Sequence, residues 1–299
     1  MSENYYCNRV VVQAPGKVNL SLDITGCRED GYHLLDMVMQ TVDLSDILII
    51  ERKNSDTIDI VSSFPNMPQG EQNICHHAAQ HFFKATGLPA QGLDIQISKH
   101  IPMQAGMAGG SADAAAVLRG LDRLFETALT DEQLCEIGLL SGADVPFCLT
   151  GGCAFVQGIG EKILSLPALP NCWMVIAKPP VGMSTGMAFN LYDTMGVTHR
   201  PDTTSMLAAV KSGNLAAIGT NLRNVFEQIT NIPEVETLKG IMLCDGALGA
   251  VMTGSGTAVV GLFDEEADAK TALRHLREQV AETYLTRPTE SGARVVLVG

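Results

Sequence analysis

Residues 102–115 form a run of glycines and small residues that leads directly into a helical pattern, and this run limits what the chain can fold into. Glycine has no Cβ, so the backbone N–H groups of such a loop can approach a ligand closely. The helix that follows leaves its first N–H groups unpaired and carries partial positive charge at its start. The run therefore predicts an anion site, most often for phosphate. The alternative is a turn needed only for tight helix–strand packing.

The helix after this loop is expected over residues 111–125, where apolar residues recur at helical spacing. Ser111 is the predicted N-cap, and Asp113 would place a carboxylate in the first turn, where it suits the helix dipole. The chain contains neither G-x-x-x-x-G-K-[ST] nor a G-x-G-x-x-G that follows a strand. The loop is therefore neither a P-loop nor a dinucleotide-binding turn.

Charge and composition exclude several classes of protein. The 299 residues carry a formal net charge of −13, which argues against nucleic acid as the main partner. No apolar run approaches the roughly 18–20 residues that a membrane helix needs, and residues 1–9 resemble neither a signal peptide nor a transit peptide. We therefore expect a cytoplasmic protein that binds no membrane.

The cysteines and histidines show no metal-ligand spacing. The eight cysteines include no C-x-x-C pair, and most lie within apolar runs. This pattern indicates reduced, buried thiols, with neither a disulfide framework nor a zinc site. A catalytic role for one of the cysteines remains an alternative, although none has an obvious base beside it in the sequence. We expect no metal bound by protein side chains alone.

The order of predicted elements indicates an α+β protein in two parts. Strands are expected at 10–14 and 18–24, and in the second strand Lys17 and Asn19 share one polar side. Thr130 and Gln133 form the capping box of a short helix. Prolines become frequent after residue 166, which marks a change in the local composition of the chain. Further elements are a mostly helical region at 184–244, strands at 249–252 and 257–263, a helix at 265–280 and a last strand at 294–298. We expect one domain over 1–160 and a smaller α/β sandwich over 161–299.

Three glycine-bearing segments, 14–17, 102–115 and 252–257, together resemble the GHMP kinases, and the resemblance covers essentially the whole chain. It implies an N-terminal domain like domain 2 of ribosomal protein S5 and a C-terminal ferredoxin-like α/β sandwich. In that family the central loop wraps the phosphates of ATP. The outer two segments close an active-site cleft between the domains.

Two longer segments carry a closer resemblance. One runs from 14–23 into 30–33 and then 39–44, and the other joins 142–147 to glycines 151, 152 and 160. Both are similar to the GHMP kinases that act on a cytidine diphosphate-linked methylerythritol in the non-mevalonate isoprenoid pathway. The resemblance implies ATP-dependent phosphorylation of the 2-hydroxyl of that substrate.

The resemblance also implies catalytic roles for Lys17 and Asp144. Phosphoryl transfer to an alcohol needs a group that takes the hydroxyl proton and cations that offset the charge on the moving phosphoryl. Asp144 matches the family's catalytic aspartate, and Lys17 matches the lysine that pairs with it. Asn19 would hold the methylerythritol hydroxyls. The structural alternatives are a solvated lysine at a strand start and an aspartate that merely caps a turn before Pro146.

Four residues match the family's nucleobase pocket. Tyr32 and His33 correspond to the cytidine-binding pair, since an aromatic ring offers a stacking face and a histidine nitrogen can read a polar edge. Thr185 and Phe189 correspond, more loosely, to the residues that close the other side. The structural alternative is that Phe189 is simply a core residue of its helix.

The residues matching the ATP site are the loop itself and Asn73, whose alternative role is a helix N-cap. Ser111 would contact a phosphate oxygen or the Mg²⁺ carried with ATP. Gln104, Ala105 and Met107 stand where many relatives have glycine or leucine, and Ala112 replaces a serine. The expected ATP-binding residues are Pro102, Met103, Gln104, Ala105, Gly106, Met107, Ala108, Gly109, Gly110, Ser111, Ala112 and Asn73.

Other functions remain alternatives at this point. They are another small-molecule kinase of the GHMP type, mevalonate diphosphate decarboxylase, and a non-catalytic nucleotide-binding module. The segment 31–33 speaks against the first two, because neither needs a platform for cytosine. The third would not need both Lys17 and Asp144. We expect the small molecule and ATP as the only partners, and a monomer or weak homodimer.

Overall fold

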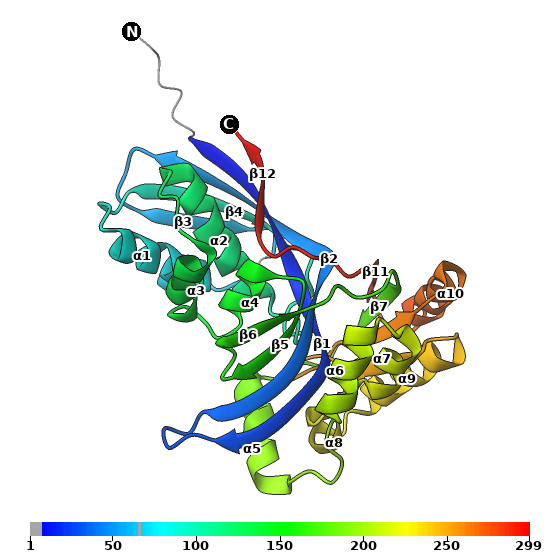
Figure 1. The fold of residues 1–299 in the computed structure, drawn as a ribbon. Helices are drawn as coiled ribbons and strands as arrows, with labels where there is room; N and C mark the ends of the chain where they lie inside the picture. Colours follow the sequence, from blue (N-terminus) through cyan, green and yellow to red (C-terminus); the bar gives the residue numbers. More distant parts are fainter. Residues whose placement is uncertain (1–7, 65–66) are drawn as a thin grey trace.

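The computed structural model describes residues 8–64 and 67–299, and its chain folds around two sheets (Figure 1). In this part of the chain the first sheet has eight strands, with the order β12-β1-β2-β4-β3 and with β5, β6 and β8 joined at its side. Its strands are β1 (Arg9–Cys27), β2 (His33–Lys53), β3 (Ile58–Ser62), β4 (Gly92–Ser98), β5 (Cys153–Gly158), β6 (Lys162–Leu166), β8 (Arg223–Asn224) and β12 (Arg294–Val298).

The strands β1 and β2 form one long antiparallel hairpin that joins the two halves of the molecule (Figure 1). The two strands expected at 10–14 and 18–24 are a single strand, whose register shifts between Pro15 and Lys17. Such a bulge bends a strand without ending it. The outer part of the hairpin therefore curves away from the first sheet, towards α5 (Thr185–Met195).

Helices cover one face of the first sheet. α1 (Ile74–Thr86) and α2 (Gly109–Phe125) bury their apolar faces against it, and α3 (Asp131–Leu139) and α4 (Val145–Thr150) follow. The predicted capping box is confirmed, because the Gln133 backbone N–H donates to Thr130 Oγ1 and the Thr130 N–H donates to Gln133 Oε1. It fixes the start of α3.

The predicted start of α2 is wrong in detail. The helix begins at Gly109, and its N-cap is Ala108, which has a left-handed backbone with φ 54°. Ser111 therefore lies inside the first turn. Asp113 lies further along the helix, where it is fully buried. Its carboxylate faces the side chain of Lys99, so a buried ion pair and not the helix dipole accounts for its place.

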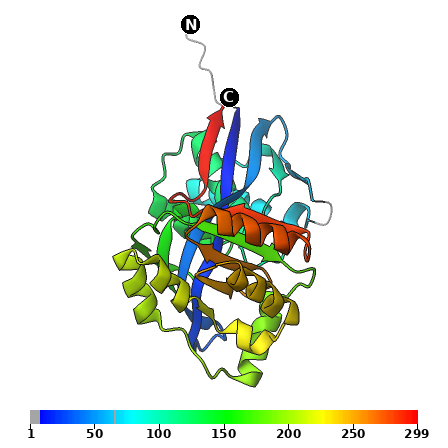
Figure 2. The ribbon, with the colours of Figure 1, turned by 90° about the vertical axis from the view of Figure 1, so that its right-hand side faces the viewer.

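The second sheet is antiparallel throughout, with the strand order β11-β7-β10-β9. The helices α9 and α10 pack on it, as the turned view in Figure 2 shows. The remaining elements are β7 (Trp173–Lys178), α6 (Thr203–Ser212), α7 (Leu215–Asn221), α8 (Phe226–Thr230), α9 (Pro233–Cys244), β9 (Gly249–Met252), β10 (Val259–Phe263), α10 (Glu266–Arg277) and β11 (Glu282–Thr286).

The strands β6, β8 and β12 follow residue 160 and belong to the first sheet. β6 lies after that residue but pairs with β5 in the first sheet, because the two strands form a tight hairpin. β12, the last strand, returns to pair with β1 and satisfies the backbone groups at that edge. None of the helices in the described residues is long and apolar enough to cross a membrane.

The thiols follow the expectation in part. Cys75, Cys148, Cys153 and Cys172 are buried and unpaired, and burial raises the pKa of each thiol. Cys27 and Cys244 are free thiols as well, but they are exposed. Cys7 lies outside the described residues.

Candidate active site

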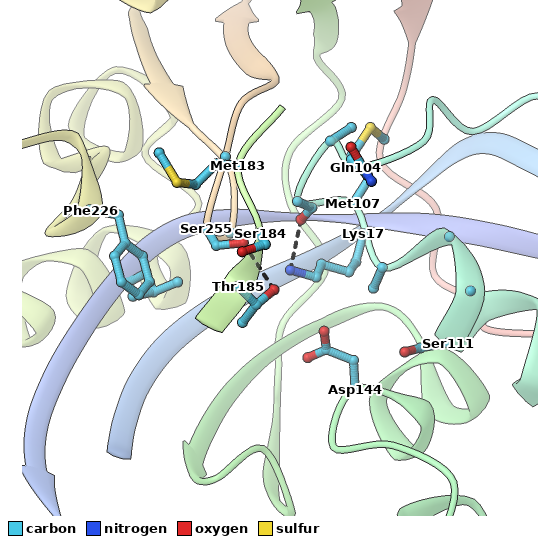
Figure 3. Close-up of a pocket in the computed structure, with 18 of the residues that line it drawn as sticks. Lys17, Gln104, Met107, Ser111, Asp144, Met183, Ser184, Thr185, Phe226 and Ser255 are labelled. Carbon is cyan, nitrogen blue, oxygen red and sulfur yellow. Dashed lines mark hydrogen bonds between the residues drawn. The ribbon is translucent and has the colours of Figure 1, made fainter. Parts of the chain in front are cut away.

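A cavity of about 530 Å³ opens where the first sheet's hairpin meets the second half of the chain (Figure 3). Three segments far apart in the sequence line it: the glycine loop, the stretch at 183–185 and the turn at 254–256. Its lining includes these predicted site residues: Lys17, Pro102, Met103, Gln104, Ala105, Gly106, Met107, Ala108, Gly109, Gly110, Ser111, Asp144, Thr185 and Phe189.

Lys17 reaches this cavity from the bulge in the middle of β1. Its side chain is held by two acceptors, since Nζ donates to Asn19 Oδ1 at 2.7 Å and to the carbonyl oxygen of Gly106 at 2.9 Å, the second of which is dashed in Figure 3. Lys17 is only 4% exposed. It is therefore not the solvated surface lysine that a strand start would favour, and its ammonium is fixed at the edge of the glycine loop.

Asp144 faces the same cavity from the start of α4 (Figure 3). It occupies the N-cap position, but its side chain makes no capping hydrogen bond. In the described part of the chain Lys17 and Asp144 form no direct ion pair, since the Lys17 ammonium is held by its two oxygen acceptors. The half-buried carboxylate is thus available to a ligand, with space between it and the ammonium.

The glycine loop is shaped by left-handed backbone at several positions. Gln104 and Ala108 have positive φ of 52° and 54°, and Gly106 has φ 73°. The Lys17 backbone N–H donates to the Met107 carbonyl at 3.1 Å, which ties the loop to β1. Ser111 follows in the first turn of α2 and lines the cavity. The start of a helix with unpaired N–H groups therefore faces the space beside Asp144.

Asn19 lies behind Lys17 and does not line the cavity. It is fully buried, and its Oδ1 accepts from Lys17 Nζ and from the Gly254 backbone N–H at 3.0 Å. Its own N–H donates to Thr253 Oγ1 at 2.9 Å. The first and third glycine segments therefore meet at Asn19, which fixes the lysine.

Asn224 supports the site from behind without lining the cavity, and no pattern in the sequence predicted it. It stands in β8, a two-residue strand parallel to β1 within a region expected to be mostly helical. Its Nδ2 donates to the carbonyl oxygens of Met252 and Gly254, each at 2.7 Å, so it holds the turn that closes the cavity. A single asparagine has no spacing signal that could have revealed this role.

The predicted nucleobase residues divide into two groups. Phe189 and Thr185 line the cavity, and His33 stacks on Phe189 with ring centroids 4.6 Å apart and planes inclined by 18°. Asp193 Oδ1 lies 2.7 Å from His33 Nε2 and so orients the imidazole. Tyr32 is 61% exposed, at the tip of the hairpin, and is not part of the cavity lining.

Asn73 and Ala112 are also absent from the lining. Asn73 is the N-cap of α1, where Oδ1 accepts from the Cys75 N–H at 2.9 Å and Nδ2 donates to the Pro68 carbonyl at 2.8 Å. Its neighbour Ile74 does reach the cavity. Ala112 is buried on the inner side of α2. The structure thus places both residues beside the site but not at its surface.

This fold and the cavity define a class of protein. The chain matches the family model of the GHMP kinases N terminal domain over residues 73–152 and that of the GHMP kinases C terminal domain over 206–282. The crystal structure of homoserine kinase from Cytophaga hutchinsonii superposes with a TM-score of 0.80 at 18% identity, over 99% of this chain and all of that one, which shows the fold. The expected two-domain GHMP kinase fold is confirmed.

More similar relatives narrow the class. The 4-diphosphocytidyl-2-C-methyl-D-erythritol kinases of Caldicellulosiruptor bescii and Clostridium tetani are 44% and 42% identical, over 93% and 92% of this chain and 98% and 99% of their own. A crystal structure of 4-(cytidine 5'-diphospho)-2C-methyl-D-erythritol kinase superposes with a TM-score of 0.76 at 30% identity, over 93% of this chain and 98% of that one. The chain belongs to the 4-diphosphocytidyl-2-C-methyl-D-erythritol kinase family.

Proposed function

We propose that this protein transfers the terminal phosphoryl group of ATP to the 2-hydroxyl of 4-diphosphocytidyl-2-C-methyl-D-erythritol, a step of the non-mevalonate isoprenoid pathway. The observation that carries the proposal is the meeting of Lys17, Asp144 and the glycine loop at one cavity. The names of the relatives support the substrate. A non-catalytic nucleotide-binding module would have no need for the lysine and the carboxylate together.

The side chains at the cavity fit the chemistry of phosphoryl transfer. Asp144 carries no capping hydrogen bond, so its carboxylate can accept the proton of the acceptor hydroxyl. Lys17 is held rigidly and can offset negative charge that develops on the transferred phosphoryl. Asn19 acts by fixing Lys17. The hydroxyl would occupy the space between the two charged groups.

The nucleotide end of the acceptor would lie towards α5. Phe189 and Thr185 line that end of the cavity, and the ring of His33, oriented by Asp193, lies against Phe189. These groups offer a flat apolar surface and polar atoms at its edge, which are complementary to the face and the edge of a cytosine ring. Tyr32 contributes to this pocket only if the hairpin tip moves towards the bound nucleobase.

The phosphates of ATP would lie along the loop at 102–111, with the N-terminus of α2 directed at them. Mg²⁺ prefers oxygen ligands and is carried by substrate phosphates in kinases. The Ser111 hydroxyl, which lines the cavity in the first turn of α2, fits that preference and would supply a protein ligand. Asn73 would support the nucleoside side through its neighbour Ile74.

A coupled assay that measures ADP release tests the assignment. The purified protein is offered ATP with 4-diphosphocytidyl-2-C-methyl-D-erythritol, mevalonate, homoserine or galactose in parallel. We expect turnover with the cytidylated acceptor alone, and a phosphorylated product without loss of carbon dioxide. Preferred turnover of another acceptor would remove the substrate assignment, and carbon dioxide release would favour the decarboxylase alternative.

Three further properties belong to this proposal. We place the enzyme in the cytoplasm as a monomer or weak homodimer, and we divide it into domains over 1–160 and 161–299, with β6 and β12 completing the first sheet. Light scattering over a range of protein concentrations tests the oligomeric state. A stable higher oligomer at micromolar concentration would contradict it.

A further inference from the structure

Three charged side chains that have no place in the cavity are buried together beneath the glycine loop. Lys99, directly after β4, donates from Nζ to Asp113 Oδ2 at 2.7 Å and also to Asp46 Oδ2. The side chains of Asp46 and Asp113 are 0% exposed and that of Lys99 is 4% exposed. Charges are almost never buried so completely without a role that outweighs their loss of hydration.

The three residues come from separate parts of the chain, and together they connect the two ends of the loop to the sheet. Asp46 Oδ1 of β2 accepts from the backbone N–H groups of His100 at 2.5 Å and Ile101 at 2.9 Å. These two residues directly precede the loop. Asp113 belongs to α2, which directly follows the loop. Lys99 joins the two carboxyl groups, so the set clamps both ends of the loop to the sheet.

The Lys99 ammonium lies directly behind the start of α2. A Cβ built on Gly109, the first residue of that helix, would lie 3.3 Å from Lys99 Nζ. Gly109 itself lines the cavity. The buried set therefore lies directly behind the first turn of α2, where the loop would hold an anion.

The two carboxyl groups are not equivalent. Asp46 receives three hydrogen bonds, from Lys99 and from two backbone N–H groups, which suit a carboxylate. Asp113 Oδ1 is buried and has no hydrogen-bond partner in the described residues. Burial, together with the charge of Asp46 and against that of Lys99, raises the pKa of Asp113 well above its usual range. The two carboxyl groups are therefore held differently, and Asp46 is the one that fixes the backbone before the loop.

We propose that Lys99, Asp46 and Asp113 form a positioning set that fixes both ends of the phosphate loop in the shape that receives the phosphates of ATP. This inference rests on the proposed function, since it takes ATP as the occupant of the loop. None of the three is a catalytic residue, because none touches the cavity. Their effect should appear in the binding of ATP phosphates and not in the binding of the cytidylated acceptor.

The test is calorimetric binding of ATP and of adenosine to the full-length protein, with KM for the acceptor measured alongside. For Lys99→Met we expect ATP binding weakened about tenfold or more, the range for loss of hydrogen bonds to a charged group. Adenosine binding and the acceptor KM should stay within about twofold. Lys178→Met is the matched control, since Lys178 is a buried lysine of the second sheet paired with Glu282 at 3.5 Å. It should leave ATP binding unchanged.

Two isosteric variants keep the test decisive if Lys99→Met does not fold. Asp113→Asn keeps the shape of the side chain and an oxygen that can accept from Lys99. The other oxygen has no partner to lose, so ATP affinity should stay within about twofold. Asp46→Asn leaves one side-chain oxygen for three donors, those of Lys99 and of the His100 and Ile101 backbone, and should weaken ATP binding about tenfold. Equal effects of the two variants, or unchanged ATP binding in Lys99→Met, would overturn the inference. Failure of the unaltered protein to bind ATP would instead overturn the proposed function.

Discussion

Gly106 and Thr253, which lie in different halves of the chain, approach so closely that a Cβ on Gly106 would lie 2.0 Å from the Thr253 carbonyl oxygen. The reverse relationship also holds, because a Cβ on Gly254 would lie 2.7 Å from the Gly106 carbonyl oxygen. The phosphate loop and the turn at 253–256 therefore pack backbone against backbone. The two segments can approach this closely because Gly106 and Gly254 have no side chain at the contact.

Gly106→Ala should disturb this contact more than an ordinary loop substitution would. Gly106 has φ 73°, a backbone conformation that favours glycine, and the clashing atom belongs to the main chain and cannot rotate away. We expect kcat/KM to fall about tenfold or more. Steady-state kinetics with varied ATP measures the change. Gly240→Ala is the control, since nothing lies within 4 Å of its Cβ position, and it should leave kcat/KM unchanged.

Asp144→Asn should lower kcat by about 10²–10⁴-fold, the usual contribution of a general base. ATP binding should persist, because the substitution keeps the shape of the side chain and the glycine loop is unchanged. Rapid-quench measurement of phosphoryl transfer, with separate calorimetry for ATP, checks both statements. Asp56→Asn serves as the control, because Asp56 is exposed in the loop that follows β2. A near-normal rate in the Asp144 variant would dismiss it as the base.

Phe189→Ala should raise the KM for the cytidylated acceptor. An aromatic stacking partner contributes about 0.5–1.5 kcal/mol beyond its buried area, which corresponds to about two- to thirteenfold. Tyr32→Ala, examined in parallel, separates two states of the hairpin. An equal rise in KM indicates that the exposed tip closes over the nucleobase, and an unchanged KM removes Tyr32 from the pocket. The KM for ATP should not respond to either variant.

Asn224→Ala should destabilise the fold and loosen the turn behind Lys17. The variant leaves two buried carbonyl oxygens, of Met252 and Gly254, without their donor. Loss of such a partner costs about 1–3 kcal/mol of unfolding free energy. Urea unfolding followed by circular dichroism measures this change. If Asn224→Asp proves as stable as the unaltered protein, the amide donor is not what holds the turn.

The local elements could largely be predicted from the sequence because their signals are local. The alternation that indicates the strand around Lys17 and Asn19, the capping box of Thr130 and Gln133, and the glycine loop before α2 all depend on residues a few positions apart. The start of α2 at Gly109 was not predicted, because Ala108 adopts a left-handed backbone conformation that is unusual for alanine. The family resemblance supplied the fold class and the expected acceptor.

The amino-acid sequence alone determined which segments carry the chemistry, because residue type and short spacing can be read directly from it. Only the tertiary structure decided how those segments meet. In the folded chain Asn19 faces Lys17 and not the cavity surface, and Asn73 caps a helix. Asn224 holds a turn that lies some thirty residues later in the sequence. The burial of Lys99 between Asp46 and Asp113 belongs to the same group. Such contacts join residues distant in the chain, and their stability comes from desolvation and packing, which no local pattern records.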